Sequence, residues 1–368
     1  MIAQPQKIIR NRYLKTTKKV GVLGGGSWAT ALVKLLTENK RNVHWYMRSE
    51  SAKAHLEKNG NNPHYLQGVT LRKKRLSIST DINEVVEKVD VLILCIPAAF
   101  LANSLAEIKG DIKNKLIVSA VKGVVPESLQ IVGHYLNESW QVPYDQITVI
   151  AGPSHAEEVG MEKLSYLTIA CQDQNSAAFI ASLFKTSYVR TKISNDIIGT
   201  EYAAMLKNIY AIAAGIAHGL NYGDNFQSVL MSNAIREMKR YIKNVHKLKR
   251  NINNSAYLGD LLVTGYSVFS RNRTFGNFIG KGYSVTAAQA EMNMVAEGYY
   301  ATKSAKLLGI NFKTRTPIID AVYAGNDKVD IDTMITFQDG SKTRIQTSVR
   351  VVDLDGNNAA KTAPKAAE

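Results

Sequence analysis

The 368-residue sequence predicts a doubly wound α/β domain followed by an all-α domain. Three observations lead to this fold class. Apolar, strand-like runs alternate with helical patterns in the first half, a glycine-rich turn follows the first strand, and long helical patterns with one apolar face fill the second half. We expect a basic N-terminal extension over residues 1–18, the α/β domain over 19–193, the helical domain over 194–324 and an atypical C-terminal segment over 325–368.

The composition excludes some classes of protein. Lysine and arginine number 46 against 31 aspartate and glutamate, which gives a net charge of +15, and 45% of the residues are hydrophobic. An acidic disordered chain and a single small module are therefore excluded. A basic balance suits nucleic acid, a membrane surface or phosphorylated small molecules, and only specific sites can choose among these partners.

The first 20 residues contain neither a long apolar run nor the apolar segment of a signal peptide. We therefore expect a soluble, cytoplasmic protein with no integral membrane segment. The two cysteines, Cys95 and Cys171, lie in apolar runs and lack the spacing of metal ligands, so we expect them to be reduced residues of the core.

In the first half, the sequence from Lys19 has the pattern of a strand, a turn and a helix. The strand reads VGVL, and the helical pattern covers Thr30 to Leu36. A second strand, VHWYM, follows, and three more strand-like runs read VDVLILCI, KLIVSAV and ITVIAG, with helical stretches between them. This alternation is typical of a parallel sheet with helices on both faces.

The second half begins near Asp196 with a change to long helical patterns. Each has the spacing of a helix with one apolar face, and they read IGTEYAAMLKNIYAIAAGIAHGL, SVLMSNAIREMKRYIKNV and SVTAAQAEMNMVAEGYYATKSAKLLG. After Ala324 the pattern changes again, because TMITF and RIQTSVRVV flank the turn dipeptide Asp339-Gly340. We expect a hairpin there, followed by a disordered tail.

The glycine-rich turn reads Gly24-Gly25-Gly26-Ser27-Trp28-Ala29 and lies between the first strand and its helix. In a Rossmann-type domain, such a turn brings backbone N–H groups and the positive end of a helix to the pyrophosphate of a dinucleotide. Ala29 stands in place of the third glycine, which is an allowed variant. An ordinary glycine turn is the alternative, but the strand–turn–helix context favours a cofactor site.

The end of the second strand indicates which dinucleotide is bound. A site specific for NAD carries Asp or Glu about 20 residues after the glycines, where it binds the ribose 2′-hydroxyl. Here the second strand ends with Tyr46-Met47-Arg48, and an arginine suits a 2′-phosphate. We therefore expect NADP or NAD as the cofactor, with NADPH favoured. The alternative is that Arg48 is a solvated surface residue.

Two further strands end in residues that could face a ligand at the edge of the sheet. Lys122 follows the strand in VSAVKG, and Gly152 and Ser154 lie in the turn of AGPSHAEE, where N–H and hydroxyl groups could hold a ligand. His155 in the same turn is a weak candidate for a general base, since nothing else in the sequence pairs with it. A solvated lysine and an ordinary turn are the alternatives.

Lys207 lies inside the apolar helix EYAAMLKNIYAIAAG, and its neighbours on the same face are Ala203, Ala211 and Ala214. A buried ammonium group is costly unless it is paired, and burial favours release of its proton. Lys207 is therefore a candidate for proton transfer. The alternative is a lysine whose side chain extends along the helix into solvent.

A dense polar cluster follows in LGDLLVTGYSVFSRNRTFG. Asp260 and Thr264 are four residues apart on one helical face, and we expect a loop that carries Ser270, Arg271 and Asn272. An arginine flanked by hydroxyl and amide groups can bind phosphate with two parallel hydrogen bonds, which a lysine cannot. The cluster therefore predicts a phosphate site, and a plain exposed loop is the alternative.

These motifs together resemble the NAD(P)-dependent glycerol-3-phosphate dehydrogenases, particularly the bacterial form that makes sn-glycerol 3-phosphate for glycerophospholipid synthesis. The resemblance runs from about Lys19 to Ala324. It rests on the ordered motifs GGGSWATAL, VSAVKG, AGPSHAEEV, LKNIYAIAAGI, GDLLVT, SRNRTFG and AEG. It implies an enzyme that forms a homodimer in the cytoplasm, reduces the small molecule dihydroxyacetone phosphate with NAD(P)H and binds no nucleic acid.

The motifs and the resemblance together assign site residues. The expected cofactor contacts are Gly24, Gly26, Ser27, Trp28, Arg48, Lys122, Ala156, Arg271, Val295 and Glu297. The expected substrate contacts are Lys122, Gly152, Ser154, Lys207, Asp260, Thr264, Ser270, Arg271 and Asn272.

The resemblance also implies a mechanism. Protonated Lys207, oriented by Asp260, gives its proton to the alkoxide that forms when the substrate carbonyl receives a hydride, and Lys122 adds positive potential. We expect no catalytic metal, because two ammonium groups supply the charge that a metal would.

Three departures from the family pattern stand out. Ala29 replaces the third glycine, Ser232-Asn233-Ala234 stands where Thr-Arg-Gly is common, and the sequence after Ala324 does not resemble the final helix of the family. Two other functions are considered. A β-hydroxyacid dehydrogenase would bind a carboxylate, which SRNRTFG argues against. A non-catalytic nucleic-acid-binding protein would need a recognisable module or an aromatic and basic surface, and neither is found.

Overall fold

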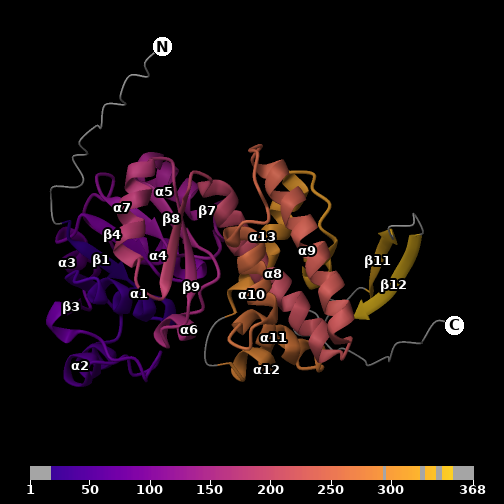
Figure 1. Ribbon diagram of the computed structural model, residues 1–368, viewed down its shortest axis with the longest axis horizontal. Helices are drawn as coiled ribbons and strands as arrows, with labels where there is room; N and C mark the ends of the chain where they lie inside the picture. Colours follow the sequence, from indigo (N-terminus) through magenta and orange to yellow (C-terminus); the bar gives the residue numbers. More distant parts are fainter. Residues whose placement is uncertain (1–17, 293–295, 324–327, 337–341, 351–368) are drawn as a thin grey trace, which may run out of the picture.

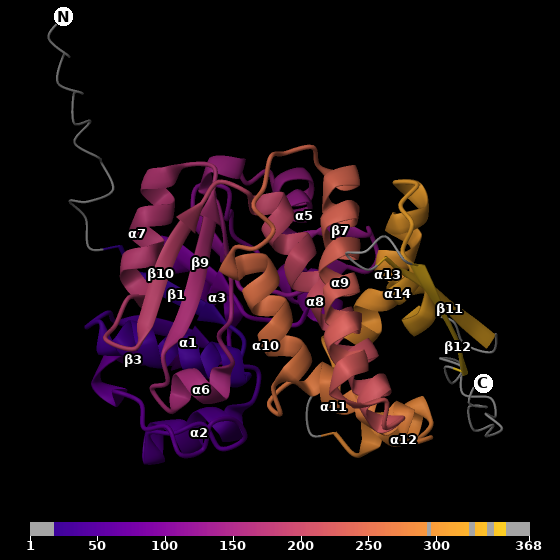
Figure 2. The ribbon, with the colours of Figure 1, turned by 45° about the vertical axis from the view of Figure 1, so that its right-hand side comes forward.

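The computed structural model describes residues 18–292 and 296–323, together with the backbone of residues 328–336 and 342–350. An α/β domain and a helical domain lie side by side, with the strands of the first at the left of Figure 1 and the long helices of the second at its right. The view in Figure 2, turned by 45°, shows the same division. The fold class expected from the sequence is therefore confirmed.

The α/β domain contains an eight-stranded sheet with the order β10-β9-β8-β5-β4-β1-β2-β3. Its strands are β1 (Val20–Leu23), β2 (Val43–Tyr46), β3 (Leu76–Ser79), β4 (Val91–Leu94), β5 (Leu116–Ser119), β8 (Ile147–Ala151), β9 (Ser165–Cys171) and β10 (Val189–Ser194). The order reverses between β1 and β4, and ligands bind at such a point in doubly wound sheets.

The sequence pattern indicated a parallel sheet, but the sheet is not wholly parallel. Strands β8 and β9 pair in antiparallel fashion. Between them lies only a turn and the five-residue helix α6 (Ala156–Gly160). Five helical residues span roughly 7 Å, whereas the five residues of β8 span roughly 17 Å. The connection is therefore too short to return to the starting edge of the sheet, and β9 runs back beside β8.

Side chains of the central strands alternate between two covered faces. Val91 and Ile93 of β4 belong to a core with residues of α1 and α7, whereas Leu92 and Leu94 belong to a core with residues of α3, α4 and α5. Burial on both faces explains why such strands read as unbroken apolar runs. The helices and small strands of this domain are α1 (Ser27–Glu38), α2 (Glu50–Asn59), α3 (Ile82–Glu87), α4 (Ala98–Ala106), α5 (Val132–Trp140), α7 (Gln174–Phe184), β6 (Val124–Val125) and β7 (Gln130–Ile131).

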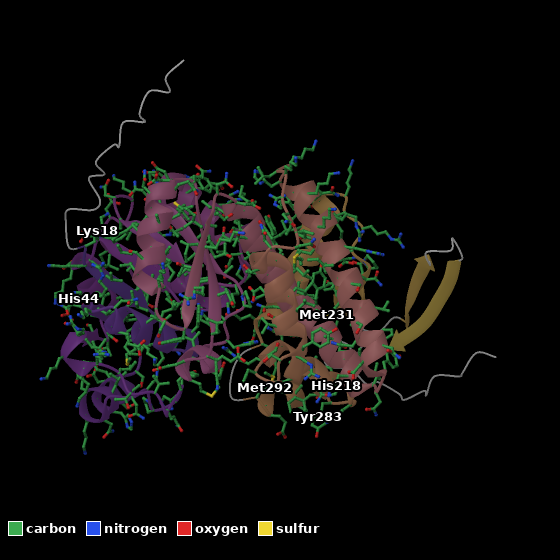
Figure 3. The ribbon with its side chains drawn as sticks, viewed as in Figure 1. Lys18, His44, His218, Met231, Tyr283 and Met292 are labelled. Carbon is green, nitrogen blue, oxygen red and sulfur yellow. The ribbon has the colours of Figure 1, made fainter. Side chains whose placement is uncertain are left out.

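The helical domain is built around α8, which is buried along most of its length. Its helices are α8 (Ile197–Gly219), α9 (Gly223–Val245), α10 (Asp260–Tyr266), α11 (Arg271–Gly280), α12 (Val285–Ala290), α13 (Glu297–Asn311) and α14 (Pro317–Tyr323). A π-helical turn, η3 (Ser255–Gly259), leads directly into α10. Met231 of α9, labelled in Figure 3, fills the space beside Gly265 of α10, where a Cβ atom would lie 2.5 Å from its Cε atom.

Two details of this domain differ from the sequence expectation. The residues Ser270 to Asn272 do not form a loop, because the Ser270 hydroxyl accepts a hydrogen bond from the N–H of Arg273 at 3.3 Å and starts α11. The last helical stretch is divided into α12 and α13. The Gly298 N–H in the first turn of α13 donates to Oδ1 of Asn272 at 2.8 Å, which fixes a new helix start against α11.

Helices α8 and α11 pack with their backbones in close approach. A Cβ atom at Gly215 would lie 2.0 Å from the carbonyl oxygen of Arg273, and one at Gly276 would lie 2.1 Å from that of Ile212. Only glycine permits this distance between the two backbones. The packing places the start of α11 against the part of α8 around Ile212 and Gly215, which follows Lys207 along the helix.

At the C-terminal end, β11 (Lys328–Thr336) and β12 (Lys342–Arg350) pair as antiparallel strands, which are at the far right of Figure 1. The expected turn at Asp339-Gly340 and the expected disordered tail lie outside the described residues, as does the basic extension up to residue 17. Among the residues that the structure describes, no helix is both long and apolar enough to cross a membrane.

Candidate active site

A cavity of about 720 Å³ lies between the two domains and is lined by residues of both. Most residues singled out in the sequence line it. These are Gly24, Gly26, Ser27, Trp28, Arg48, Lys122, Ser154, Ala156, Lys207, Asp260, Thr264, Ser270, Arg271, Asn272 and Glu297. Gly152 is absent from the lining, and Val295 lies outside the described residues. Met292, labelled in Figure 3, also lines the cavity.

The glycine-rich turn forms one wall of the cavity at the reversal of strand order. Gly24 follows β1 with a φ of +119°, and a Cβ atom there would lie 2.6 Å from the carbonyl oxygen of Cys95, which follows β4. The turn is held from behind by Trp45, whose Nε1 donates to the Gly24 carbonyl at 2.7 Å. The open backbone of the turn and the first N–H groups of α1 therefore face the cavity, as binding of a pyrophosphate requires.

Arg48 lies just beyond β2 and is exposed at the edge of the same cavity. Trp28, at the second position of α1, has a buried Nε1 atom with no hydrogen-bond partner in the structure. A buried donor without a partner is unusual in a native protein and is consistent with a group that a ligand satisfies. These residues fit a dinucleotide that carries phosphate on its ribose.

Lys207 and Asp260 form an ion pair in the wall of the cavity. The Nζ atom of Lys207 donates to Oδ1 of Asp260, and the two residues are 4% and 1% exposed. The second carboxylate oxygen of Asp260 accepts a hydrogen bond from the N–H of Gly152 at 3.1 Å. Gly152 therefore contacts Asp260 from behind instead of lining the cavity, and the Lys207 side chain does not extend into solvent.

Thr264 and Ser154 complete the wall on either side of this pair. The Thr264 hydroxyl donates to the Asp260 carbonyl at 2.6 Å, and the Ser154 hydroxyl donates to the Gly152 carbonyl at 2.9 Å. Both hydroxyl groups thus make their hydrogen bonds within the protein. Each oxygen still has lone pairs that can accept a further hydrogen bond.

Lys122 is a second lysine in the lining of the cavity. Its Nζ atom lies 5.3 Å from the ring centroid of Trp28, and the amide of Asn208 donates to its backbone carbonyl at 3.3 Å. Burial and then the neighbouring positive charge of Lys207 lower the pKa of Lys122 to about 8. The group is therefore predominantly protonated at neutral pH but can lose its proton in mildly alkaline solution.

His155 lies at the cavity with two positive neighbours. Burial, followed by the charges of Lys207 and Lys122, lowers its pKa to about 4. The imidazole is consequently neutral at pH 7 and is a weak base. Lys207 is better placed to exchange a proton, because it is paired with Asp260 and buried in the wall.

The start of α11 carries Arg271 and Asn272, the residues expected from the sequence to bind phosphate. Arg271 and Asn272 are its first two residues, and the Arg271 guanidinium reaches across to Ser27, donating from Nη2 to the hydroxyl at 3.0 Å. Glu297 begins α13 nearby and also lines the cavity. A guanidinium at a helix N-terminus is suited to an anion.

Several residues of the cavity were missed from the sequence, and two of them hold its backbone through hydrogen bonds. Asn208 lines the cavity and holds the backbone of Lys122, and its position next to Lys207 was the only available signal. Asn62 donates from Nδ2 to the Gly25 carbonyl at 3.0 Å and to the Thr30 hydroxyl at 2.9 Å. No pattern identifies Asn62, because it lies in an irregular segment far from the glycines in sequence. Among the described residues, no group of three or more His, Cys, Asp and Glu side chains could hold a metal ion.

Comparison with known proteins gives consistent results for both halves of the chain. The family model of the NAD-dependent glycerol-3-phosphate dehydrogenase N-terminus matches residues 19–177, and that of the C-terminus matches residues 196–335. A glycerol-3-phosphate dehydrogenase [NAD(P)+] from Bacillus pumilus is 34% identical over 310 residues, which are 83% of this chain and 89% of the relative. One from Latilactobacillus sakei is 35% identical over 314 residues, covering 83% and 92%.

Solved structures are also similar. A glycerol-3-phosphate dehydrogenase from Coxiella burnetii matches with a TM-score of 0.77 and 25% identity, covering 83% of this chain and 93% of that one. A D-mandelate dehydrogenase matches with a TM-score of 0.56 and 16% identity, covering 83% and 96%, which shows a shared fold alone.

Proposed function

Because the chain belongs to the NAD-dependent glycerol-3-phosphate dehydrogenase family, it reduces dihydroxyacetone phosphate to sn-glycerol 3-phosphate with NAD(P)H, and we propose that Lys207 supplies the proton. One observation carries the assignment of Lys207. Its ammonium group is buried in the cavity wall and paired with a carboxylate that has a second hydrogen bond of its own. An ammonium group held in this way is preorganised for the charge that develops on the substrate oxygen.

The substrate phosphate is bound by Arg271 and Asn272. The proposal is supported by their position in the first turn of α11, where backbone N–H groups and the helix dipole favour an anion. The planar guanidinium can form two parallel hydrogen bonds to phosphate oxygens. Ser270, Ser154 and Thr264 line the cavity and offer hydroxyl groups to the rest of the substrate.

Proton transfer is carried out by the chain's own residues around the substrate carbonyl. Asp260 fixes the ammonium of Lys207, which gives a proton to the developing alkoxide, and Lys122 stabilises the same negative charge. In the reverse direction, neutral Lys207 takes the proton from the hydroxyl of sn-glycerol 3-phosphate. Asp260 holds the amine in place by accepting its hydrogen bond.

The dinucleotide, when bound, supplies the hydride. We assign its pyrophosphate to the turn from Gly24 to Ser27, and we assign Trp28, Lys122, Ala156, Arg271 and Glu297 to its other parts. Arg48 favours NADPH, because its guanidinium can pair with a 2′-phosphate. Val295 is proposed for the same site from the sequence alone.

We also propose that the enzyme is a cytoplasmic homodimer that supplies sn-glycerol 3-phosphate for glycerophospholipid synthesis. This part of the proposal follows from membership of the family. Light scattering of the purified protein at several concentrations measures the oligomeric state, and a mass of 40.6 kDa throughout would contradict a dimer.

The function is tested by following absorbance at 340 nm with NADPH and three substrates. We expect turnover of dihydroxyacetone phosphate and little turnover of unphosphorylated dihydroxyacetone or of a β-keto acid. The reason is that Arg271 and Asn272 contribute their binding energy through contacts with the phosphate group. Comparable kcat/KM values for the phosphorylated and unphosphorylated ketones would refute the assignment of the phosphate site.

A further inference from the structure

We propose that the carboxylate of Asp196 positions the proton-transfer pair, because it binds both the helix that carries Lys207 and the turn that leads into Asp260. Asp196 lies between β10 and α8, outside the lining of the cavity. It therefore acts through other residues and is a positioning residue. The inference rests on the proposed role of Lys207.

The first contact of Asp196 is with the helix of Lys207. Its Oδ1 atom accepts a hydrogen bond from the Gly199 N–H at 3.0 Å, so it caps the N-terminus of α8, and its backbone carbonyl accepts from the Thr200 hydroxyl at 2.6 Å. Lys207 lies eleven residues further along, which is about three helical turns and returns to nearly the same face. The cap therefore fixes the start and the rotation of the helix that presents Lys207.

The second contact is with the turn that precedes Asp260. Tyr257, which is 4% exposed, donates from its hydroxyl to Oδ2 of Asp196 at 2.5 Å. It belongs to η3, and the last residue of η3, Gly259, immediately precedes Asp260. Because no linker separates η3 from α10, a displacement of Tyr257 is transmitted directly to the backbone of Asp260.

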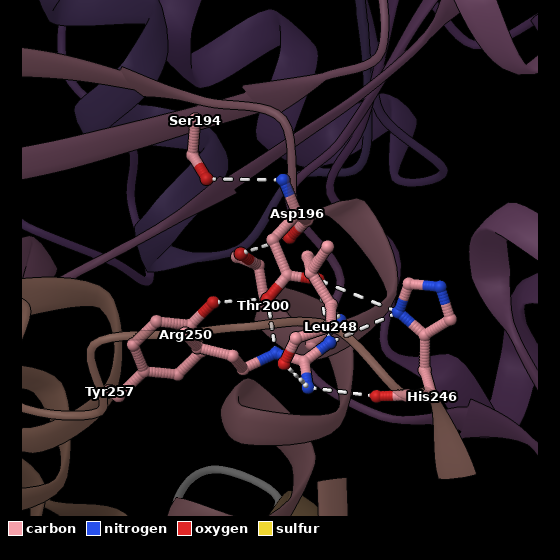
Figure 4. A network of polar contacts seen from close by, with 8 residues as sticks. Ser194, Asp196, Thr200, His246, Leu248, Arg250 and Tyr257 are labelled. Atoms are coloured by element: carbon pink, nitrogen blue, oxygen red, sulfur yellow. Dashed lines mark hydrogen bonds and ion pairs between the residues drawn. The ribbon is translucent and has the colours of Figure 1, made fainter. Parts of the chain in front are cut away.

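Arg250 holds the carboxylate in place between these two elements. It donates from Nε to Oδ2 of Asp196 at 2.5 Å and from Nη2 to Oδ1 at 3.0 Å, and its side chain is 7% exposed. Its Nη1 atom also donates to the carbonyl of His246 at 2.9 Å, as Figure 4 shows. Burial alone would raise the pKa of Asp196, but the hydrogen bonds from Arg250 and Tyr257 lower it below its usual value, so the group stays ionised.

The network is also tightly packed. A Cβ atom at Gly199 would lie 2.2 Å from Oδ2 of Asp196 and 2.5 Å from Nε of Arg250. The ion pair therefore lies directly against the first turn of α8, at a distance that only a glycine permits. In a tightly packed network, the loss of one hydrogen bond to Asp196 is expected to displace the residues that are bonded to it, because there is little empty space for local rearrangement.

The proposal is tested with Tyr257→Phe, which removes one hydrogen bond and keeps the ring. We expect kcat for dihydroxyacetone phosphate reduction to fall about tenfold, since small misplacements of catalytic groups have large effects on rate. The KM for NADPH should stay unchanged, and the solvent deuterium isotope effect on kcat should increase as proton transfer becomes slower than the other steps.

A matched control is Tyr241→Phe. Tyr241 is also fully buried and donates one hydrogen bond, to the carbonyl of Ala305 at 2.9 Å. This hydrogen bond joins α9 to α13, and the Tyr241 ring contacts α8 only through the ring of Tyr202, at 6.0 Å between centroids, among the contacts given for the described residues. We expect a similar loss of thermal stability, with kcat and the isotope effect of the wild type. This comparison separates a positioning effect from a general loss of a buried hydrogen bond.

Conservative replacement of Arg250 gives a second, independent measurement should Tyr257→Phe fold poorly. Arg250→Lys keeps the charge and one hydrogen bond, whereas Arg250→Met removes both. We expect kcat to decrease in the order wild type, Arg250→Lys, Arg250→Met at constant KM for NADPH.

Failure of this inference is distinguishable from failure of the proposed function. If Tyr257→Phe and Arg250→Met turn over at the wild-type rate, with an unchanged isotope effect, the positioning role is refuted while the role of Lys207 stands. If Lys207→Met itself keeps full turnover, the proposed function of Lys207 is refuted whatever the network does.

Discussion

The Nη2 atom of Arg271 donates a hydrogen bond to the Ser27 hydroxyl at 3.0 Å, and this contact joins the first turn of α11 in the helical domain to the first turn of α1 in the α/β domain. These two helix starts are the sites proposed for the substrate phosphate and for the cofactor pyrophosphate. One guanidinium is therefore within reach of both ligands. We therefore expect binding of the substrate and binding of the cofactor to depend on each other through Arg271.

Arg271→Lys tests this shared role. A lysine keeps the positive charge but loses the planar fork, so it can contact only one of the two sites at a time. We expect kcat/KM for dihydroxyacetone phosphate to fall at least about tenfold and the KM for NADPH to rise as well. Steady-state kinetics with both ligands varied measure this. The control, Arg240→Lys, changes an arginine on α9 that does not line the cavity, and both constants should stay at wild-type values.

Arg48→Asp tests the cofactor preference. A carboxylate repels the 2′-phosphate of NADPH but accepts a hydrogen bond from the 2′-hydroxyl of NADH, so the ratio of kcat/KM values should move toward NADH. Arg72→Asp makes the same change of charge at another exposed arginine of the domain, which does not line the cavity. An equal change of the ratio in both variants would mean that net charge, and not contact with Arg48, sets the preference.

Most of the fold could be predicted because its signals are local. The Gly24 to Ala29 turn and the alternation of strands and helices each lie within a short stretch of sequence. The antiparallel pairing of β8 with β9 depended on the length of α6, which periodicity does not reveal. The start of α11 was missed because Arg271 and Asn272 are polar and hide the helical pattern, although Ser270 is a typical cap.

The site could be predicted where a residue's chemistry conflicts with its surroundings. Lys207 is such a case, because a single cation interrupts an alanine-lined face. Asn62 and Arg250 carry no such conflict, since each lies in an irregular polar segment. Their roles arise only when the fold brings them beside the glycine turn and beside Asp196. Contacts of this kind follow from tertiary structure and leave no periodic trace in the sequence.

Glu201 provides a prediction for stability and pH. It is 2% exposed on α8, both of its carboxylate oxygens accept a hydrogen bond from the Gly133 N–H of α5, and burial raises its pKa from 4.5 to about 8. Between these two values the folded protein binds more protons than the unfolded chain, so the free energy of unfolding decreases as pH rises, by at most about 1.4 kcal/mol per pH unit. Its stabilising contribution is complete below pH 4.5 and is lost above pH 8.

Glu201→Gln should therefore raise the melting temperature relative to the wild type at pH 9 and have little benefit at pH 5, because the amide carries no charge at either pH. Thermal denaturation at both values measures this. Glu127→Gln changes an exposed glutamate of the α/β domain and should show no such dependence on pH. The raised pKa would be contradicted if the difference in melting temperature between the wild type and Glu201→Gln were the same at pH 5 and at pH 9.

Replacement of Lys207 tests the chemistry itself. Lys207→Ala removes a proton donor that acts on charge present only in the transition state, and such groups contribute about 10²- to 10⁴-fold to the rate. We expect kcat to fall by at least roughly the lower figure, while the dissociation constant of NADPH, measured by fluorescence titration, changes little. Lys207→Met keeps an unbranched apolar stem without the charge and leaves Asp260 without its cation, so it should be impaired to the same extent. If Met restores turnover to near the wild-type rate, Lys207 serves packing alone, and Lys122, whose pKa of about 8 leaves it predominantly protonated at neutral pH, becomes the candidate proton donor.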